Sequence, residues 1–179
     1  MRYGSPHTLA PRPSQIPEGD IPEDLLNLAY LDKEKVTVRH QNRSAVNGSL
    51  VLCDSAFPLV YSPITPDRFG DTGMEAKLLA AVTGLEMDEV ALDGVGETIF
   101  NLERAISIRE GRTTEDDLSV TPSLIKAGDW TRNIKLDDQR YRGLLKAYYL
   151  ERGWDPETGA PTDKKLQELG LSDVIGDLK

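Results

Sequence analysis

The segment 86–110 constrains the fold most, because its apolar residues recur at helical steps. The stripe comprises Met87, Ala91, Val95, Ile99, Leu102 and Ile106. Steps of four and three residues place side chains on one face of an α-helix, whereas a half-buried strand requires strict alternation. No segment of the chain sustains such alternation. The sequence therefore predicts an all-α fold with few strands.

Further helical patterns are bounded by capping residues. Helices are predicted over 23–31, 34–48, 72–84, 137–152 and 162–169. Thr72 and Glu75 have the spacing of a capping box, and Thr162 is the predicted N-cap of the last helix. Glycine adopts the left-handed conformation that ends many helices, so four glycines mark predicted helix ends: Gly84, Gly111, Gly153 and Gly170.

The candidate core comes from two more helical faces and one short run. One face has Met74, Leu78, Ala81 and Val82, and the other has Tyr141, Leu144, Leu145 and Tyr148. Leu50–Cys53 reads as a short buried run after helix 34–48. Gly94 and Gly96 each cost helix 86–110 up to about 1 kcal/mol relative to alanine. We expect them to permit close packing of a neighbouring helix.

Prolines and turn residues divide the chain. Five of the first 22 residues are prolines, which lack an amide donor and restrict the preceding residue. Residues 1–22 are therefore predicted to be an extended proline-rich arm, and 23–179 a helical domain. Loops are expected at 58–72 and 111–136, and a turn at 155–161.

Composition excludes several classes of protein. The net charge of −9 argues against a nucleic-acid binder, which needs a basic face. No apolar run approaches the roughly 20 residues of a membrane span, and the N-terminus lacks the apolar segment of a signal peptide. A single cysteine fits a reducing, cytoplasmic compartment.

Cys53 is the only cysteine, so any chemical role for it needs groups from outside this sequence. It cannot form a disulfide within the chain or a site of four thiolates by itself. Three apolar residues precede it. This local pattern on its own favours a small buried thiol.

The other polar candidates have ordinary structural interpretations. His7 lies in the proline-rich arm, and His40 lies between Arg39 and Gln41 on a polar helix, where solvent exposure is expected. A solvated or interhelix ion-pair face is expected for Glu97, Glu103, Arg104, Arg109 and Glu110. The acidic run Glu115–Asp117 is expected to be solvated. Arg152, Trp154 and Asp155 are expected to form a structural corner, with Trp154 covering the end of the core.

Three stretches, in order, carry a family resemblance. The first is Leu52-Cys53-Asp54 with Glu75-Ala-Lys-Leu-Leu-Ala-Ala-Val-Thr-Gly84 downstream, and the second runs from Gly96 to Gly111. The third is Tyr148-Tyr-Leu-Glu-Arg-Gly-Trp-Asp155, followed by Thr158–Leu171. Together they resemble the C-terminal helical region of the aldehyde:ferredoxin oxidoreductase family over about residues 45–171.

The resemblance implies an iron–sulfur, tungsten- or molybdenum-pterin enzyme that oxidises aldehydes to carboxylic acids with ferredoxin as electron acceptor. Such a [4Fe–4S] cluster needs four thiolates. Cys53 matches the fourth ligand of the family's cluster, and the three upstream cysteines are absent from this sequence. The implied partners are the N-terminal part of the enzyme and a ferredoxin or electron-transfer subunit. The isolated chain is expected to be inactive.

The segment before Cys53 departs from the family pattern. Many members have Asp-x-x-Gly-Leu-Cys, whose early residues approach a pterin, whereas this chain has Gly48-Ser-Leu-Val-Leu-Cys53. Ser49 and Asn47 remain as possible polar contacts on the pterin side. Two alternatives follow: a reductase of an aromatic acyl-CoA or carboxylate that uses the same cofactors, and a non-catalytic helical interaction module.

Overall fold

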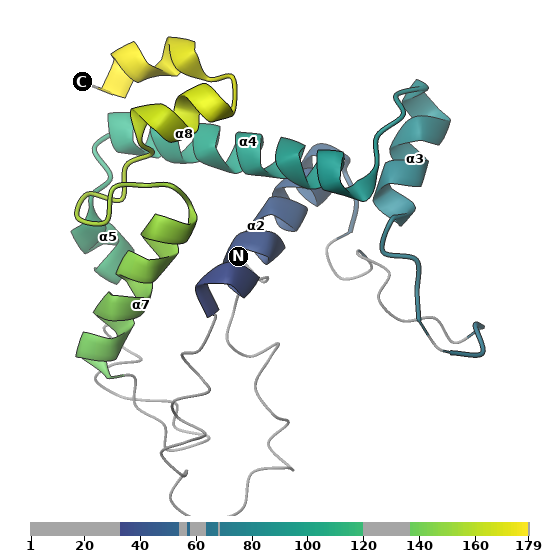
Figure 1. Ribbon diagram of the computed structural model, residues 1–179, viewed down its shortest axis with the longest axis horizontal. Helices are drawn as coiled ribbons and strands as arrows, with labels where there is room; N and C mark the ends of the chain where they lie inside the picture. The colour runs from purple at the N-terminus through teal and green to yellow at the C-terminus, as the bar shows by residue number, and fades with distance from the viewer. Residues whose placement is uncertain (1–32, 54–56, 58–63, 68, 120–136, 179) are drawn as a thin grey trace, which may run out of the picture. The chain divides into compact units, whose positions relative to one another are not determined.

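The computed structural model describes residues 33–53, 57, 64–67, 69–119 and 137–178. Its elements are α2 (Lys33–Ser49), α3 (Met74–Thr83), α4 (Glu89–Arg109), α5 (Thr114–Ser119), α7 (Asp138–Glu151), α8 (Asp163–Glu168) and the 3₁₀ helix η3 (Ser172–Leu178) (Figure 1). No extended strand occurs among these residues, which confirms the all-α prediction. The predicted arm 1–22 and helix 23–31 lie outside the described residues.

Most helix ends follow their predicted signals. The Thr162 hydroxyl accepts a hydrogen bond from the Lys165 amide, so the predicted N-cap of α8 is confirmed. Helix α3 ends at Gly84, whose backbone is left-handed with φ 74°. Helix α4 begins later than predicted, at Glu89, because the Asp88 carboxylate accepts a hydrogen bond from the Ala91 amide at 2.7 Å. The predicted loop 111–136 contains the short helix α5 in its described part.

The predicted capping box at the start of α3 is wrong. Gly73 is the N-cap and no side chain caps it. The Thr72 hydroxyl donates instead to Glu89, at 3.3 Å. Glu75 is fully buried and accepts from Arg43 at 3.1 Å. A buried arginine therefore competes for the carboxylate that would otherwise close the box.

The chain forms two compact units. Unit 1 comprises Met1–Val38 and Arg104–Lys179, and unit 2 comprises Arg39–Glu103. Helix α2 and helix α4 each contribute residues to both units.

Unit 2 has a small apolar core where α2, α3 and α4 meet. Its buried apolar residues are Val46, Ala76 and Leu92, with Leu50 and Leu79 packed against them. Helices α2 and α4 approach closely at Gly96, where an added Cβ would lie 2.2 Å from the backbone oxygen of Asn42. The expected close packing is thus confirmed at Gly96, whereas Gly94 has nothing within 4 Å of its Cβ position.

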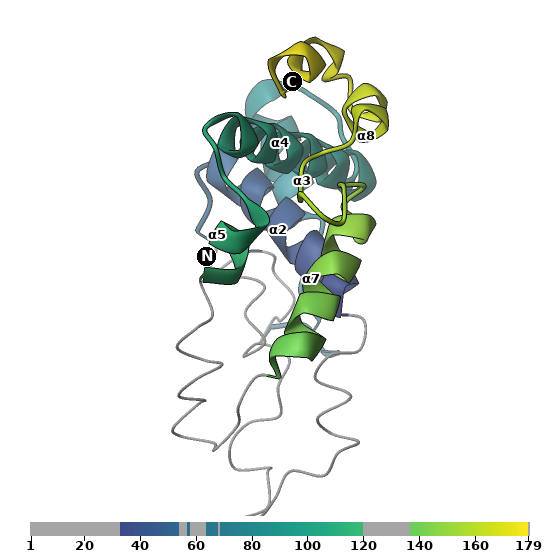
Figure 2. The same cartoon turned by 90° about the vertical axis from the view of Figure 1, so that its left-hand side faces the viewer.

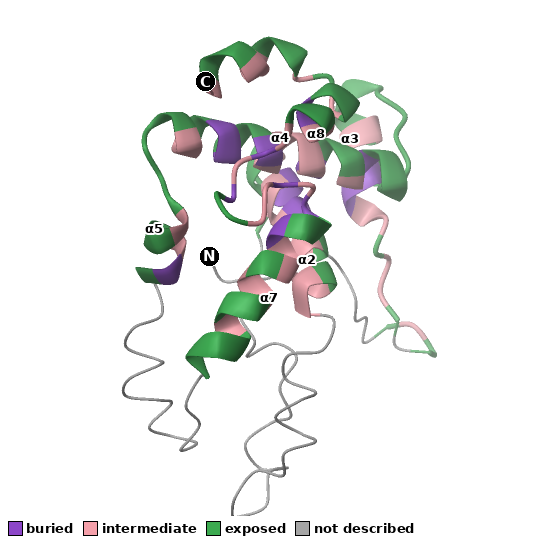
Figure 3. Cartoon of the chain, turned by 60° about the vertical axis from the view of Figure 1, so that its left-hand side comes forward, coloured by how far each residue is buried: buried purple, intermediate pink, exposed green. Residues whose placement is uncertain are grey.

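The predicted apolar stripe of α4 is not its buried face. Leu92 and Gly96 are buried, whereas Ala91 and Val95, one position before each, are exposed. The same holds in α3, where Leu78 and Val82 are exposed and Glu75 and Ala76 are buried. Figure 3 shows how short the buried stretches of these helices are. Periodicity identified the helices correctly but selected the wrong face.

Unit 1 is held around two aromatic residues of its C-terminal half. Tyr149 of α7 and Trp154 after it are buried, with ring centroids 5.9 Å apart. Leu166 of α8 is fully buried, and η3 packs beside α8 (Figure 2). Arg152 is also fully buried and donates to the Val38 carbonyl at 3.3 Å. Both Arg152 and Trp154 are therefore structural residues, as predicted.

Candidate functional site

Cys53 lies in the turn that follows α2 and is exposed. The predicted buried run is wrong here: Val51 is 90 % exposed, and only Leu50 and Leu52 are partly buried. The interpretation of Cys53 as a buried thiol is wrong for the same reason. The structure presents the single thiol at the surface of unit 2.

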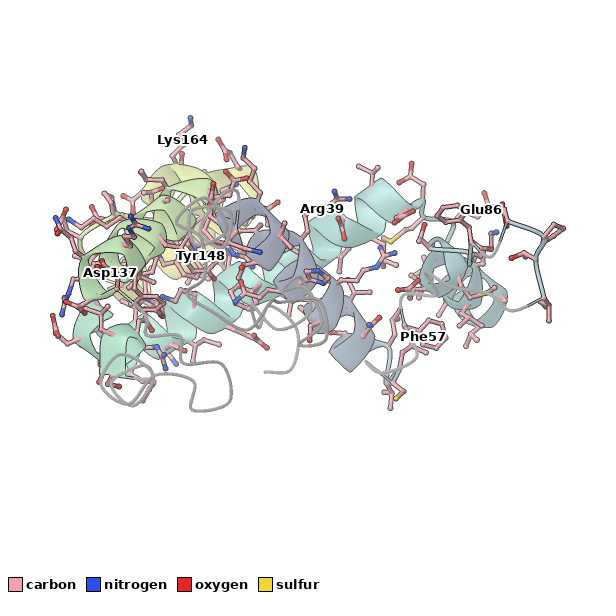
Figure 4. The ribbon with its side chains drawn as sticks, turned by 90° about the horizontal axis from the view of Figure 1, so that it is seen from below. Arg39, Phe57, Glu86, Asp137, Tyr148 and Lys164 are labelled. Atoms are coloured by element: carbon pink, nitrogen blue, oxygen red, sulfur yellow. The ribbon has the colours of Figure 1, made fainter. Side chains whose placement is uncertain are left out.

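Backbone hydrogen bonds fix the chain on both sides of Cys53. The Leu52 amide donates to the Asn47 carbonyl at 2.8 Å, and the Val51 amide donates to the Gly48 carbonyl at 3.3 Å. This pair is the Schellman arrangement that ends a helix, with Val51 in the position usually occupied by glycine. Beyond it, the amide of Phe57 (labelled in Figure 4) donates to the Cys53 carbonyl at 3.0 Å.

Val51 is in a strained conformation. Its φ is 58°, and it is the non-glycine residue that has positive φ in the described part of the chain. A β-branched residue pays about 1–2 kcal/mol for the left-handed region. Val51 stands where the family motif Asp-x-x-Gly-Leu-Cys has its glycine. A left-handed backbone at this position explains why the motif has glycine there. This chain keeps the same left-handed turn although the residue is valine.

Replacing Val51 by glycine is expected to raise the free energy of unfolding by about 0.5–1 kcal/mol. Relief of about 1–2 kcal/mol of left-handed strain exceeds the roughly 0.5–1 kcal/mol that glycine adds to the unfolded-state entropy. Urea unfolding followed by circular dichroism measures the change. Val51→Ala is the control, because alanine keeps the strain; equal stabilisation by both variants would contradict this explanation.

The polar residues near Cys53 are turned toward their own helix or turn. The Ser49 hydroxyl donates to the Ala45 carbonyl at 2.9 Å and is exposed. Asn47 is 2 % exposed, and its amide nitrogen donates weakly to the Phe57 carbonyl at 3.4 Å. The Asn47 side-chain oxygen is buried without a hydrogen-bond partner. Asn47 therefore contacts the Cys53 turn through Phe57, whereas the Ser49 side chain bonds back to its own helix.

No cluster of three or more histidine, cysteine or carboxylate side chains with metal-binding geometry is found in the described residues. His40 is partly buried on α2, and His7 lies outside those residues. Within the same described residues, Cys53 is thus not part of a ready-made metal site.

Arg43 is buried in unit 2 and joins α2, α3 and α4. Its guanidinium pairs with Glu75 at 3.1 Å, with Glu89 at 3.0 Å and with Asp93 at 3.7 Å. It also donates to the Thr72 carbonyl. Burial raises the pKa of Asp93, although Arg43 acts in the opposite direction. The arginine thereby positions the starts of α3 and α4 against α2.

A second ionic centre in unit 1 has Asp117 at its middle. Arg104 donates to both carboxylate oxygens of Asp117, at 2.7 and 3.1 Å. Arg112 donates to Asp117 at 2.7 Å, and the Tyr149 hydroxyl donates at 2.5 Å. Burial opposes ionisation of Asp117, but these hydrogen bonds outweigh it and lower its pKa. Burial and the Asp117 charge raise the pKa of Tyr149.

The C-terminal turn at 155–161 closes over this centre. Arg104 donates to the Gly159 carbonyl at 2.8 Å, and its guanidinium lies 4.9 Å from the Trp154 ring centroid. Gly159 has φ 67°, and a Cβ there would lie 2.7 Å from the Tyr149 ring. Asp155 holds the turn by accepting from the amides of Glu157 and Thr158, which confirms the predicted turn. The Arg104 and Asp117 side chains are only 8 % and 12 % exposed, and the contacts of this centre join α4, α5, α7 and the C-terminal turn, so we interpret it as structural.

Sequence reasoning missed this role of Asp117. The run Glu115–Asp117 was expected to be solvated, and this is wrong for Asp117, whose side chain is only 12 % exposed. The expected interhelix ion pair is confirmed for Arg104. Nothing in the local sequence separates Asp117 from its acidic neighbours, because two of its three partners, Arg104 and Tyr149, lie on α4 and α7.

The turn around Cys53 and the Gly153–Gly159 corner both lie within a segment that matches one family of proteins. Residues 3–171 match the family model described as aldehyde ferredoxin oxidoreductase, domains 2 & 3. The chain belongs to this family. The match covers nearly all of the 179 residues, and it sets the chain in the context of an oxidoreductase. None of the described helices is long and apolar enough to cross a membrane.

Proposed function

We propose that this chain is the helical C-terminal part of an oxidoreductase that oxidises aldehydes to carboxylic acids and passes the electrons to ferredoxin. The observation that carries the proposal is the exposed Cys53, presented by a capped turn within a segment that matches the family. In this role Cys53 is the fourth thiolate of a [4Fe–4S] cluster beside a tungsten- or molybdenum-pterin.

The residues of the Cys53 turn fit one corner of such a cluster. A cluster of this kind takes four thiolates, and this sequence has one. The exposed side chain leaves the sulfur open to a centre outside the chain. The Schellman cap before Cys53 and the hydrogen bond from Phe57 after it fix the backbone, so the sulfur needs little reordering to bind iron.

The reaction divides between the cofactors and the polypeptide. When bound, the metal-pterin supplies the two-electron chemistry and the cluster carries the electrons onward. Oxidation of an aldehyde to an acid takes one oxygen from water and releases two protons and two electrons. In this division Cys53 contributes a ligand, and Asn47 holds the turn that presents it. The isolated chain is accordingly inactive.

A second candidate runs the same cofactors in the reducing direction, on an aromatic acyl-CoA or a carboxylate. It is favoured by Gly48 and Val51, which replace the aspartate and the glycine of the common motif. Assays of the complete enzyme in both directions separate the two. Faster turnover of an aldehyde with an oxidised acceptor supports the first, and turnover of the acyl compound with a low-potential donor supports the second.

Changing Cys53 to alanine tests the ligand role. The chain is reconstituted with the polypeptide that carries the three other cluster cysteines, and iron content and the electron paramagnetic resonance of the reduced cluster are measured. We expect Cys53→Ala to lose the [4Fe–4S] signal and most of the roughly four irons expected per assembly, with unchanged helical circular dichroism.

Ser44→Ala, on α2 and away from the turn, is the control and is expected to keep the cluster. Full iron and an unaltered signal in Cys53→Ala would refute the ligand role. That outcome would favour a non-catalytic interaction module.

A further inference from the structure

Exposed apolar side chains concentrate in unit 2. Twelve large apolar residues are exposed in the described part of the chain, and ten of them belong to unit 2. Unit 1 has the other two, Ile106 and Leu150. Six of the ten lie within residues 78–95: Leu78, Val82, Leu85, Met87, Val90 and Val95. Single exposed apolar residues are ordinary, but such a concentration in one short segment is typical of interaction surfaces.

Unit 2 buries few apolar residues in its own core, so the apolar residues that it leaves exposed are a large share of its total. Among its described residues only Val46, Ala76 and Leu92 are buried apolar residues. Domains of about 60 residues are marginally stable even with an ordinary core. By contrast, Val82 and Val90, at 84 % and 80 % exposed, remain in water. A partner that covers them supplies the apolar burial that the unit lacks.

The charge of the same segment restricts the chemistry of the partner. Unit 2 has four basic and ten acidic residues, a net charge of −6 out of the −9 of the chain. Residues 78–95 contain four acidic residues and no basic one: Glu86, Asp88, Glu89 and Asp93. Glu86 is exposed, and its side chain is labelled in Figure 4. A complementary surface is therefore apolar with lysine or arginine around it.

We propose that residues 78–95, termed the 78–95 surface, form the contact surface for domain 1 of this family, and that domain 1 meets them with apolar residues flanked by lysine or arginine. The matched model covers domains 2 and 3, so domain 1 is the part outside the match. Cys53 is exposed on the same unit as the 78–95 surface. This step rests on the proposed function, because a partner that brings three thiolates to Cys53 must pack on unit 2.

The test measures binding of the full chain to the family's domain 1, supplied as a separate polypeptide, by isothermal titration calorimetry. The double variant Val82→Ser/Val90→Ser is expected to weaken binding at least about tenfold, as loss of buried apolar contacts does at interfaces. Serine and valine have similar helix propensities, so α3 and α4 are retained. Leu150→Ser, at a residue 63 % exposed in unit 1, is the matched control and is expected to bind like wild type.

Charge reversal gives a second readout. Glu86→Lys is expected to weaken binding severalfold at low ionic strength, with the difference shrinking as salt is added. If the double variant and Glu86→Lys both bind domain 1 with wild-type affinity, the proposal that the 78–95 surface contacts domain 1 is wrong. Absence of binding by the wild-type chain would also overturn it, as would a dimer of this chain alone, detected by light scattering, that the double variant abolishes.

The iron content of the complex separates an error in the 78–95 surface from an error in the proposed function. If the complex forms through Val82 and Val90 but holds no iron with Cys53 intact, the surface stands and the cluster role fails. If the complex holds its cluster while the double variant binds normally, the cluster role stands and the surface is wrong.

Discussion

Replacing Asp117 by alanine is expected to lower the free energy of unfolding of the chain by about 3 kcal/mol. Asp117 is the common acceptor for Arg104, Arg112 and Tyr149. The side chains of Arg104 and Asp117 are only 8 % and 12 % exposed. Removing one partner of a buried ion pair leaves the other charge uncompensated, which typically costs about 3–5 kcal/mol. Partial exposure of Asp117 places the loss toward the lower end.

Denaturant unfolding followed by tryptophan fluorescence measures the loss, because Trp154 lies beside Arg104. Glu115→Ala, an exposed position on the same helix, is the matched control and is expected to change stability by no more than about 0.5 kcal/mol. Equal, small effects of the two substitutions would show that the ionic centre contributes nothing to stability.

The same centre predicts how stability depends on pH. The pKa of Asp117 is lowered in the folded state, so its contribution is complete above its unfolded pKa of about 3.9. The contribution is lost as the pH falls through the lower, folded value. Asp117→Asn is therefore expected to be less stable than the wild-type chain at neutral pH, and to converge with it in strong acid. A constant gap down to about pH 2 would contradict the linkage.

What the sequence alone reveals depends on how local the relevant contacts are. The Thr162 cap, the Gly84 helix end and the turn at Asp155 use partners within a few residues, so pattern and chemistry predict them. Asp117 has one partner five residues away, Arg112, but the other two come from positions 104 and 149. Its role is therefore invisible in the acidic run that contains it.

The buried faces of α3 and α4 were missed for a different reason. Their apolar stripes are real, but the structure buries a face that includes Glu75 and Gly96, because Arg43 and the Asn42 backbone are there to meet them. The stripe that periodicity selects includes Val82 and Val95, which are exposed. An apolar stripe shows which face of a helix could be buried, but it does not show whether a neighbour is present to bury it.

The sequence pointed to Cys53 as the candidate residue, but it did not predict the conformation of the turn around it. Cys53 was selected by the stretches that flank it, whereas the burial of Asn47 and the left-handed Val51 came only from the structure. Valine is uncommon at a left-handed position, so sequence statistics argue against the turn that the structure contains. Only the adjacent hydrogen bonds from Leu52 and Val51 show that the helix still ends there.

Replacing Gly96 by alanine is expected to lower the free energy of unfolding by about 2 kcal/mol. The added methyl group would lie 2.2 Å from the Asn42 carbonyl oxygen and 3.0 Å from a methyl carbon of Val46. The first of these contacts is with backbone, which cannot rotate away, so α2 and α4 must separate. Overpacking of this kind commonly costs about 1–3 kcal/mol, and the contact with backbone places Gly96 at the upper end. Subtracting the gain of up to about 1 kcal/mol from alanine's helix propensity leaves a net loss of about 2 kcal/mol.

Gly94→Ala provides the matched control on the same helix. Its added methyl group has nothing within 4 Å, so only the helix propensity changes, and stability is expected to rise by up to about 1 kcal/mol. Thermal and urea unfolding of the two variants should thus shift in opposite directions. If both stabilise the chain, α2 and α4 do not meet at Gly96. The core of Val46, Ala76 and Leu92 would then need another explanation, because this contact sets the spacing of the helices that enclose it.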